Sequence, residues 1–376
     1  MSQIEIRPVS GKSDLKAFVA LPGQVSANDP HWVEPLHIER GEFYSPKKNP
    51  WYANGRAALF LAWKDGRPVG RISAQIDGLL PSVEGQTCGL FGSLSAYDDA
   101  AAVHALLDAA EAWLRAEGAG RMRGPLTFNM NHEVGLLIDG FDTDPFILMH
   151  HDPAHLQAHV ESWGLEKARD VYAYRLNTDN GLPEKLRRFF KKAPDNLVIR
   201  DMNVKEWDQD VAHIARIFHA SWKDNWGFNP YSDAEIKKLE KDMRPIVDGG
   251  LCRIAEVDGE PIGFITLLPN VNEAIKDFKG KLFPFNIIKL LWRLKFQKIR
   301  GARVPLMGVM PNLDPAVSSI VPLMLIYSPE KRYRERGFRE LEFGWILEDN
   351  RPVRRLIEML GSHIEKTYRV YERPLD

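Results

Sequence analysis

Three polar residues, Glu348, Asp349 and Asn350, follow an apolar run near the end of the chain and precede a short basic segment. Asp and Asn are preferred at helix starts, and Pro352 suits a first helical turn, so these residues can cap a helix. The end of a strand that faces a helix start is also where α/β proteins bind ligands. Glu342 lies six residues before Glu348, and even spacing on a strand puts both carboxylates on one face, where they can act as proton acceptors.

Aromatic side chains crowd the segment SWKDNWGFNPYSDAEI, residues 221–236. Trp222, Asn225, Trp226 and Tyr231 are candidates for the wall of a substrate pocket, because such a cluster is unusual in a plain connector. An aromatic cluster that only stabilises the loop is the alternative. Tyr368 lies on the last alternating segment and is a candidate proton donor, although Tyr is also common in strands.

A basic and apolar segment, residues 276–303, carries nine Lys or Arg residues and a single acidic one. Within it a basic stripe would face an apolar stripe, formed by Lys289, Arg293, Gln297 and Arg300 and by Ile287, Leu290, Leu291 and Leu294. Such a helix can lie on an anionic membrane or bind an amphipathic ligand. We therefore expect peripheral membrane contact through residues 278–300. A core helix with a solvated basic edge is the alternative, and nucleic acid is a weaker one.

The composition fits a globular protein of two ordinary domains: 376 residues, 44% hydrophobic and 27% charged. A net charge of -1 argues against bulk binding of nucleic acid. Cys88 and Cys252 show no disulfide pattern, the first residues lack a signal peptide, and apolar runs fall short of the roughly 20 residues of a membrane span. We expect a cytoplasmic location, at most peripheral to the inner face of the membrane.

The chain repeats itself. IEIR at residues 4–7 matches LVIR at 197–200, and DGRPVGRI at 65–72 matches DGEPIGFI at 258–265, so both matches have a shift of 193 residues (197 minus 4 and 258 minus 65). Each half reads as a strand, a helical segment, a hairpin, a strand, a long helix and a closing strand–helix–strand. The Asp-Gly-x-Pro pattern predicts a hairpin loop slightly longer than two residues.

This order of elements, with a DG-x-P-x-G hairpin ahead of a strand and a long helix, resembles the GNAT family of acyl-CoA N-acyltransferases. In plan the chain is similar to Fem-type transferases and N-myristoyltransferase. The resemblance implies an α/β (α+β) chain of two GNAT-like domains, each a mixed central sheet flanked by helices. The first would span residues 1–177, a linker residues 178–196, and the second residues 197–376 with an insertion at 273–303.

The resemblance also implies the co-substrate, acyl-CoA, and transfer of its acyl group to an amine. Met307 and Val309, on the strand before the long helix, and Asn350 would contact the donor, with Ser318 and Ser319 near its pyrophosphate. Glu348, supported by Glu342, would take the proton from the amine, and Tyr368 would protonate the leaving thiolate. The segment around residues 222–231 would shape the acceptor pocket.

The sequence departs from the family pattern at two places. The glycine-rich pyrophosphate loop is missing from both halves, and Ile357 stands where the family has the tyrosine acid. Asp98 and Asp99, which can cap the long helix of the first half, would also repel a pyrophosphate. We therefore expect the first half to be degenerate and to support an active second half.

The basic apolar insertion favours a long-chain acyl donor and a lipid-like amine, such as a sphingoid base. One alternative is a non-catalytic module that binds acyl-CoA or lipid, and another is a Fem-like transferase that uses aminoacyl-tRNA. His155 and His159 lie four residues apart, but no third ligand has a useful spacing, so no metal site is predicted.

Overall fold

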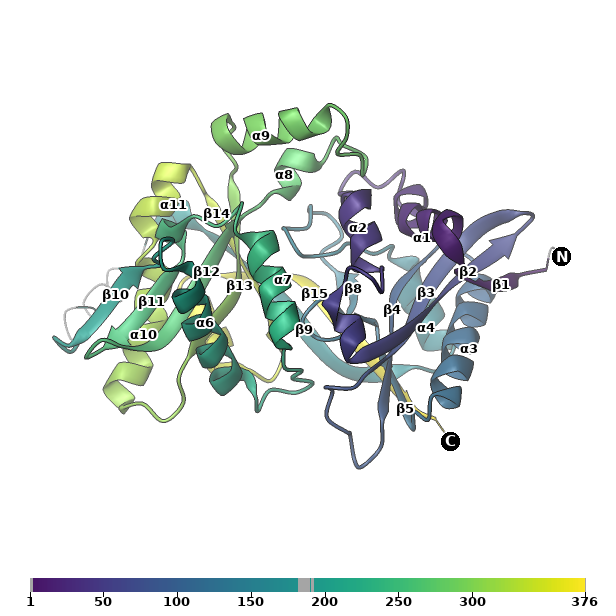
Figure 1. The fold of residues 1–376 in the computed structure, drawn as a ribbon, viewed down its shortest axis with the longest axis horizontal. Coiled ribbons are helices and arrows are strands. Elements are labelled where there is room, and N and C mark those ends of the chain that lie inside the picture. Colours follow the sequence, from purple (N-terminus) through teal and green to yellow (C-terminus); the bar gives the residue numbers. More distant parts are fainter. Residues whose placement is uncertain (1–2, 182–189, 191–192, 376) are drawn as a thin grey trace. The chain divides into compact units, whose positions relative to one another are not determined.

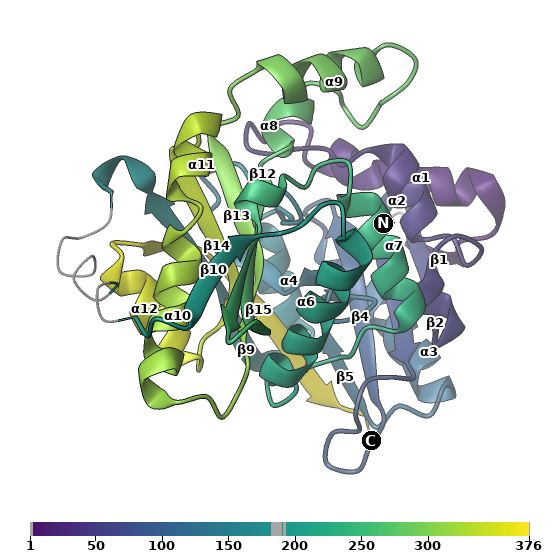
Figure 2. The same cartoon turned by 60° about the vertical axis from the view of Figure 1, so that its left-hand side comes forward.

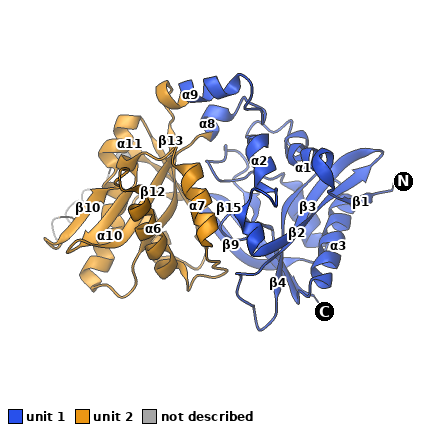
Figure 3. Cartoon of the chain, viewed as in Figure 1, with its two compact units in different colours: residues 1–172, 272–292, 365–376 blue, residues 173–271, 293–364 orange. Residues whose placement is uncertain are grey.

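The computed structural model describes residues 3–181, 190 and 193–375. Within it the chain forms two compact units (Figure 3). Unit 1 comprises Met1–Tyr172, Asn272–Trp292 and Glu365–Asp376, and unit 2 comprises Ala173–Val271 and Arg293–Ile364. Each unit has a mixed sheet flanked by helices, which confirms the predicted fold class. The predicted linker, residues 178–196, lies largely outside the described residues.

Unit 1 holds the elements of the first repeat (Figure 1). They are β1 (Glu5–Pro8), α1 (Gly11–Val25), α2 (His37–Phe43), η1 (Pro50–Ala53), β2 (Gly55–Lys64), β3 (Arg67–Asp77), β4 (Cys88–Ala96), α3 (Ala100–Ala116), β5 (Arg121–Gly124), β6 (Leu126–Thr127), β7 (Glu133–Val134), β8 (Leu136–Asp139), α4 (His155–Ser162) and the first half of β9 (Glu166–Asn177). Neighbouring residues of β3 face opposite helices. Gly70 lies so close to α3 that a Cβ there would meet Leu106, whereas Arg71 donates to the carbonyl oxygen of Phe18 on α1 at 2.8 Å.

Unit 2 repeats this plan, with helices flanking the sheet β10-β11-β12-β13-β14 (Figures 1 and 2). Its elements are β10 (Leu197–Asp201), α6 (Trp207–Trp222), α7 (Asp233–Met243), η3 (Gly249–Leu251), β11 (Arg253–Val257), β12 (Glu260–Pro269), β13 (Gly301–Val309), α10 (Pro315–Tyr327), α11 (Glu330–Arg336), β14 (Glu340–Leu347) and α12 (Arg351–Met359). Gly263 faces Val321 of α10, while the next residue, Phe264, packs with Ile217 and Phe218 of α6.

The Asp-Gly hairpins are tighter than the sequence pattern suggested. Lys64 pairs with Arg67, so only Asp65 and Gly66 form the turn, and both have positive φ angles of 50° and 72°. This is a type I′ turn, and the hairpin 193 residues later repeats it. The longer loop was wrong because Pro68 sits beside a bulge in the ladder, where a strand tolerates proline.

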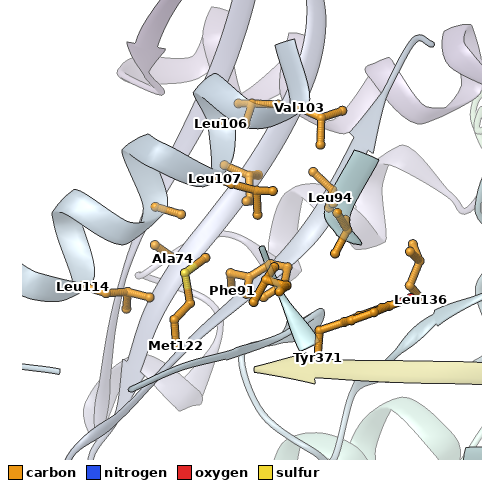
Figure 4. Packing of buried hydrophobic residues seen from close by; sticks show 14 of the residues in the cluster. Ala74, Phe91, Leu94, Val103, Leu106, Leu107, Leu114, Met122, Leu136 and Tyr371 are labelled. Atoms are coloured by element: carbon orange, nitrogen blue, oxygen red, sulfur yellow. The ribbon is translucent and has the colours of Figure 1, made fainter. Parts of the chain in front are cut away.

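The second repeat supplies a strand to unit 1. β15 (His363–Pro374) pairs with β5 in an antiparallel ladder that places Tyr371 opposite Gly124. Tyr371 is buried in the same apolar cluster as Phe91 and Leu136 (Figure 4). Part of the predicted insertion, with α8 (Asn272–Ile275) and most of α9 (Asn286–Phe296), also belongs to unit 1. The compact units therefore differ from the two continuous segments that the repeat defines.

Candidate active site

Most of the predicted site residues lie in unit 2, near the point where β13 and β14 part. The two strands pair in parallel only as far as Val304 opposite Phe343, although β13 continues to Val309 and β14 to Leu347. Met307 and Val309 lie on the diverging part of β13 and are half-buried. The role of both residues as donor contacts stays a prediction.

The long helices of both units begin at an aspartate. The carboxylate of Asp314 accepts a hydrogen bond from the Ala316 amide at 2.8 Å, and Asp99 caps α3 in the same way. Ser318 and Ser319 are exposed in the first turns of α10, and the Ser319 hydroxyl donates to the Ala316 carbonyl. Since a carboxylate at a helix start opposes a second anion there, these serines do not form a favourable pyrophosphate site.

Of the two predicted carboxylates, Glu342 lies within β14 and Glu348 follows directly after it. Glu342 is completely buried and lies opposite Arg303 in the ladder, with 3.1 Å between its carboxylate and the guanidinium. Its burial in an ion pair favours a structural role for Glu342 over the predicted role as a proton acceptor. Glu348 is half-buried beyond the strand, and Asn350 caps α12 by accepting from the Val353 amide at 3.4 Å.

The aromatic segment closes one face of the unit 2 sheet. The Trp222 indole donates to the Met307 carbonyl at 3.3 Å, so two residues predicted for acceptor and donor binding meet. Asn225 and Trp226 follow in the turn after α6 and are half-buried. The rings packed on this face belong to Phe218, Trp222, Phe228, Tyr231 and Phe264. This packing stabilises the segment, and the predicted role of its residues in substrate binding stays a prediction.

Tyr368 belongs to unit 1, whereas Glu342 and Glu348, which were predicted to act with it, belong to unit 2. Its side chain is completely buried, and its hydroxyl donates to the His150 carbonyl at 3.1 Å. The two rings are packed at a tilt, with 4.9 Å between centroids. A buried hydroxyl already bonded in this way is poorly placed to donate a proton to a thiolate, so the structure favours a role in holding His150.

Unit 1 contains a cavity of about 90 Å³, lined by both charged and apolar side chains, that the sequence did not reveal. The Arg40 guanidinium lies 3.0 Å from the Glu133 carboxylate at its wall. His150 Nε2 donates to the Gly135 carbonyl at 2.8 Å and lies 3.2 Å from the Asp152 carboxylate. The ionisable residues that line the cavity include Arg40, Arg71, Glu133, His150, His151 and Asp152. Opposite charges and a histidine in one enclosed space can bind a polar group and exchange a proton with it.

The electrostatics of this cavity shift several pKa values. Burial alone would lower the pKa of His150, but the Asp152 carboxylate outweighs it and raises the pKa to about 8. Burial would raise the pKa of Glu133, but the Arg40 guanidinium outweighs it and lowers the pKa to about 2. For His132, burial outweighs the neighbouring Glu133 carboxylate and lowers the pKa to about 4. The cavity therefore holds a charged carboxylate beside a histidine that titrates near neutral pH.

The repeat itself carried a signal for this cavity. Position 71 of the first half corresponds to position 264 of the second, as the shift of 193 residues requires. Arg71 stands where the other copy has Phe264, and both side chains are buried on the face of the first helix. A buried arginine in place of an aromatic ring marks the first half as the copy with a polar interior.

No family model matches the chain. The bacterial ceramide synthase of Caulobacter vibrioides is 41% identical over 377 residues, which cover 100% of this chain and 98% of that protein. The chain belongs to the bacterial ceramide synthase family. Protein YghO of Escherichia coli, 39% identical over 98% of this chain and 95% of its own length, is another relative in this family.

Solved structures show the fold of this ceramide synthase family member. A tandem GNAT protein from the clavulanic acid biosynthesis pathway superposes with a TM-score of 0.58 over 100% of this chain and 99% of its own, at 12% identity. A GCN5-related N-acetyltransferase from Sphaerobacter thermophilus gives 0.56 over 99% and 96%, at 13% identity. These likenesses confirm the predicted tandem GNAT fold.

Within the described ranges, no helix is both long enough and apolar enough to cross a membrane. Among the same residues, no three His, Cys, Asp or Glu side chains gather as a metal site requires. His155 instead bonds the Ala96 carbonyl, and His159 lies 2.7 Å from the Asp98 carboxylate.

Proposed function

We propose that this chain transfers an acyl group from acyl-CoA to the amine of a sphingoid base and so makes a ceramide. One observation carries the proposal: the identity of 41% to the Caulobacter ceramide synthase over the whole chain. The tandem GNAT fold supports it, because acyl transfer to amines is the reaction that the sequence resemblance implies for this fold. The substrates are then a thioester and a long-chain amino alcohol.

The acyl chain of the donor supplies most of its affinity in this proposal. Both long helices begin at a capping aspartate, so neither start offers its amides to a pyrophosphate. Burial of apolar chain contributes about 0.8 kcal/mol per methylene, which favours long donors over short ones. We therefore expect palmitoyl-CoA to bind much more tightly than acetyl-CoA.

The partner of α9 in this proposal is an anionic membrane surface, from which the enzyme draws its lipid substrates. The helix and the turn before it expose large apolar side chains, with Phe285 exposed by 79% and Trp292 by 58%. The other exposed apolar side chains here are Phe283, Ile288, Leu291 and Phe296. Basic residues outnumber acidic ones nine to one in residues 276–303. Apolar side chains between lysines and arginines suit insertion among anionic headgroups.

The apolar face that touches lipid in this proposal is only in part the one that periodicity suggested. The helical pattern put four residues on the apolar side, of which Leu291 is exposed while Ile287, Leu290 and Leu294 are half-buried. The exposed stripe also includes Ile288 and Trp292. The helix ends at Phe296, before Gln297 and Arg300 of the predicted basic stripe.

The test is an assay with the purified full chain, palmitoyl-CoA and sphinganine in mixed micelles. We expect N-palmitoylsphinganine and free CoA in equal amounts, with acetyl-CoA a far poorer donor. Binding of palmitoyl-CoA without any amide product from a panel of sphingoid bases would favour the non-catalytic alternative. A tight, strongly salt-dependent affinity for tRNA would favour the Fem-like alternative.

A further inference from the structure

The unit 1 cavity is built as a binding site, and its walls contain polar atoms without a partner. Arg71 Nε, His151 Nδ1 and Trp32 Nε1 are buried and make no hydrogen bond to the described residues. All three side chains line the cavity, and Arg71 and His151 are only 9% and 2% exposed. An unsatisfied buried polar group costs about 1–3 kcal/mol, so three around one cavity point to a polar ligand.

The strand beside the cavity is distorted. The β3–β4 ladder shifts register between Arg71 and Ser73, and Ser93 has a φ angle of 51°, which is strained for a residue other than glycine. The Ser93 amide donates to the Thr127 hydroxyl at 3.0 Å, and Ser93 and Ser95 both line the cavity. β4 is the strand before the long helix of unit 1. Bulges of this kind occur next to active sites, where they redirect side chains.

His150 presents one ring nitrogen as a proton acceptor. A carbonyl oxygen only accepts hydrogen bonds, so the contact with Gly135 fixes the proton of neutral His150 on Nε2. Nδ1 then carries the lone pair. The Asp152 carboxylate contacts Nε2 and the Tyr368 ring packs against the imidazole, so both fix its orientation. The Asp152 carboxylate is in turn positioned by the Leu137 amide, from which it accepts a hydrogen bond at 2.9 Å.

We propose that this cavity binds the amino-alcohol head of the acceptor in unit 1, with His150 as the base that takes the proton from its amine. Arg71 would donate to a hydroxyl oxygen, and the Glu133 carboxylate would attract the amine before it loses its charge. A volume of about 90 Å³ is several times the roughly 10–15 Å³ that one water needs, which suits a head of a few polar atoms. This inference rests on the proposed function and adds the site and its base.

The step balances with His150 alone as proton carrier. The ammonium group first loses one proton to solvent, and the neutral amine nitrogen then attacks the thioester carbonyl carbon and forms the C–N bond. His150 Nδ1 takes one proton from that nitrogen, the C–S bond breaks, and the imidazolium returns the proton to the leaving thiolate. The products are an amide and a thiol, and the base is neutral again. This cycle also removes the need for the tyrosine that Ile357 replaces.

The charges around His150 suit this role. Asp152, from the same loop as His150, and Glu133 on β7 favour the imidazolium, while Arg40 and Arg71 lower the pKa of Glu133 and keep it charged. Tyr368 from β15 packs on the ring without a charge. A base with a pKa near 8 accepts a proton from nitrogen and gives it to a thiolate with little penalty in either direction.

The test compares His150→Gln with the wild type in the sphinganine assay, with His104→Gln, a histidine on α3 outside the cavity, as the matched control. Loss of a general base should lower kcat by about 10²- to 10⁴-fold, with a much smaller change in the KM for sphinganine. His104→Gln should keep the wild-type kcat. A wild-type rate for His150→Gln, or loss of the rate with Glu348→Gln instead, would overturn the inference and leave the proposed function intact.

Binding is tested without catalysis by 2-amino-1,3-propanediol, a head group without a chain. We expect it to compete with sphinganine and to bind the wild type in calorimetry, and Arg71→Met to weaken both effects at least tenfold. Circular dichroism checks that Arg71→Met is folded. If it is unfolded, the same binding measurements are made with Ser95→Ala, a milder change in the cavity lining. If no acyl transfer occurs but the diol binds through Arg71, the proposed function fails and the site stands. If the diol does not bind the active wild type, the site fails.

Discussion

Arg71 and Phe264 hold the same position in the two repeats, and one is a buried cation where the other is a buried aromatic ring. Each follows a glycine against which the long helix packs, and each faces the first helix of its unit. In unit 2 the ring joins a cluster that closes this face of the sheet. In unit 1 the guanidinium keeps the face polar and borders the cavity. The two copies share a framework and differ in the chemistry of one face.

The pH dependence of the rate should report on His150. Neutral His150 is the form that accepts a proton, so we expect kcat/KM to rise with pH and to level off above about 8. Asp152→Asn removes the charge that stabilises the imidazolium, so the rising limb should move to lower pH. Values of kcat/KM between pH 6 and 10 measure the shift. If Asp152→Asn leaves the pH of half-maximal kcat/KM unchanged, His150 is not the group that titrates.

The same raised pKa affects stability with a defined sign. His150 binds its proton more tightly in the folded chain than at its ordinary pKa of 6.5, so it stabilises the fold fully below that pH. This contribution should disappear as the pH rises through 8. Urea unfolding of wild type and His150→Gln at pH 6 and 9 would show a larger difference at pH 6. A difference that does not change with pH would be inconsistent with the raised pKa.

The Arg40–Glu133 pair should be more important to stability than any exposed pair. Glu133→Gln leaves the Arg40 guanidinium, 13% exposed, without its carboxylate. Removal of one partner of a wholly buried pair costs about 3–5 kcal/mol, and we expect about 2–3 kcal/mol because Glu133 is 27% exposed. Denaturant unfolding measures the change. Glu42→Gln, in the exposed pair with Lys48, is the control and should cost under about 1 kcal/mol.

Asn350 offers a direct test of capping against donor contact. Asn350→Ala should lower the stability by about 1 kcal/mol, because the Val353 amide loses its acceptor. Asn350→Asp keeps an acceptor and should restore the melting temperature. If the carboxamide also contacts the donor, the Kd for palmitoyl-CoA will stay weak in Asn350→Asp. Recovery of both quantities would mean that Asn350 only caps the helix.

Membrane binding should depend on the exposed side chains of α9. We expect the double variant Phe285→Ser, Trp292→Ser to lose at least tenfold in affinity for vesicles of phosphatidylglycerol and phosphatidylcholine, since each large side chain that enters the lipid contributes about 1.5–3 kcal/mol. Sedimentation with the vesicles measures it, and phosphatidylcholine alone should bind less. Met359→Ser removes an apolar side chain of similar exposure on α12 and serves as the control. Equal binding by all three proteins would exclude α9 as the docking element.

Local rules predicted the framework of this chain well. The Asp-Gly pairs gave both hairpins, Asp99 gave the start of α3, and two matches at one shift gave the repeat. Each of these features depends on residues that are neighbours in sequence. The burial of Glu342 depends instead on Arg303 of the neighbouring strand. Spacing along one strand cannot reveal a partner on another strand.

The candidate cavity escaped the sequence analysis for a similar reason. Its residues come from α1, α2, β3, β4, β6, β7 and the loops between them, and none of them has a spacing that suggests a site. Arg71 was visible as a difference between two matched segments, but a basic residue in a strand is ordinarily taken as exposed. Arg71 is buried because α1 packs over β3, which the sequence of the strand does not indicate.

β15 has a consequence for how this protein is made. Unit 1 takes the strand next to β5 from residues that are translated after the rest of both repeats. The first repeat therefore emerges with an open sheet edge and an incomplete core, and must wait for the second repeat to be translated. Loss of β15 would then damage unit 1 as well as the repeat that contains it. Evolution cannot shorten this protein to its first repeat without supplying that strand anew.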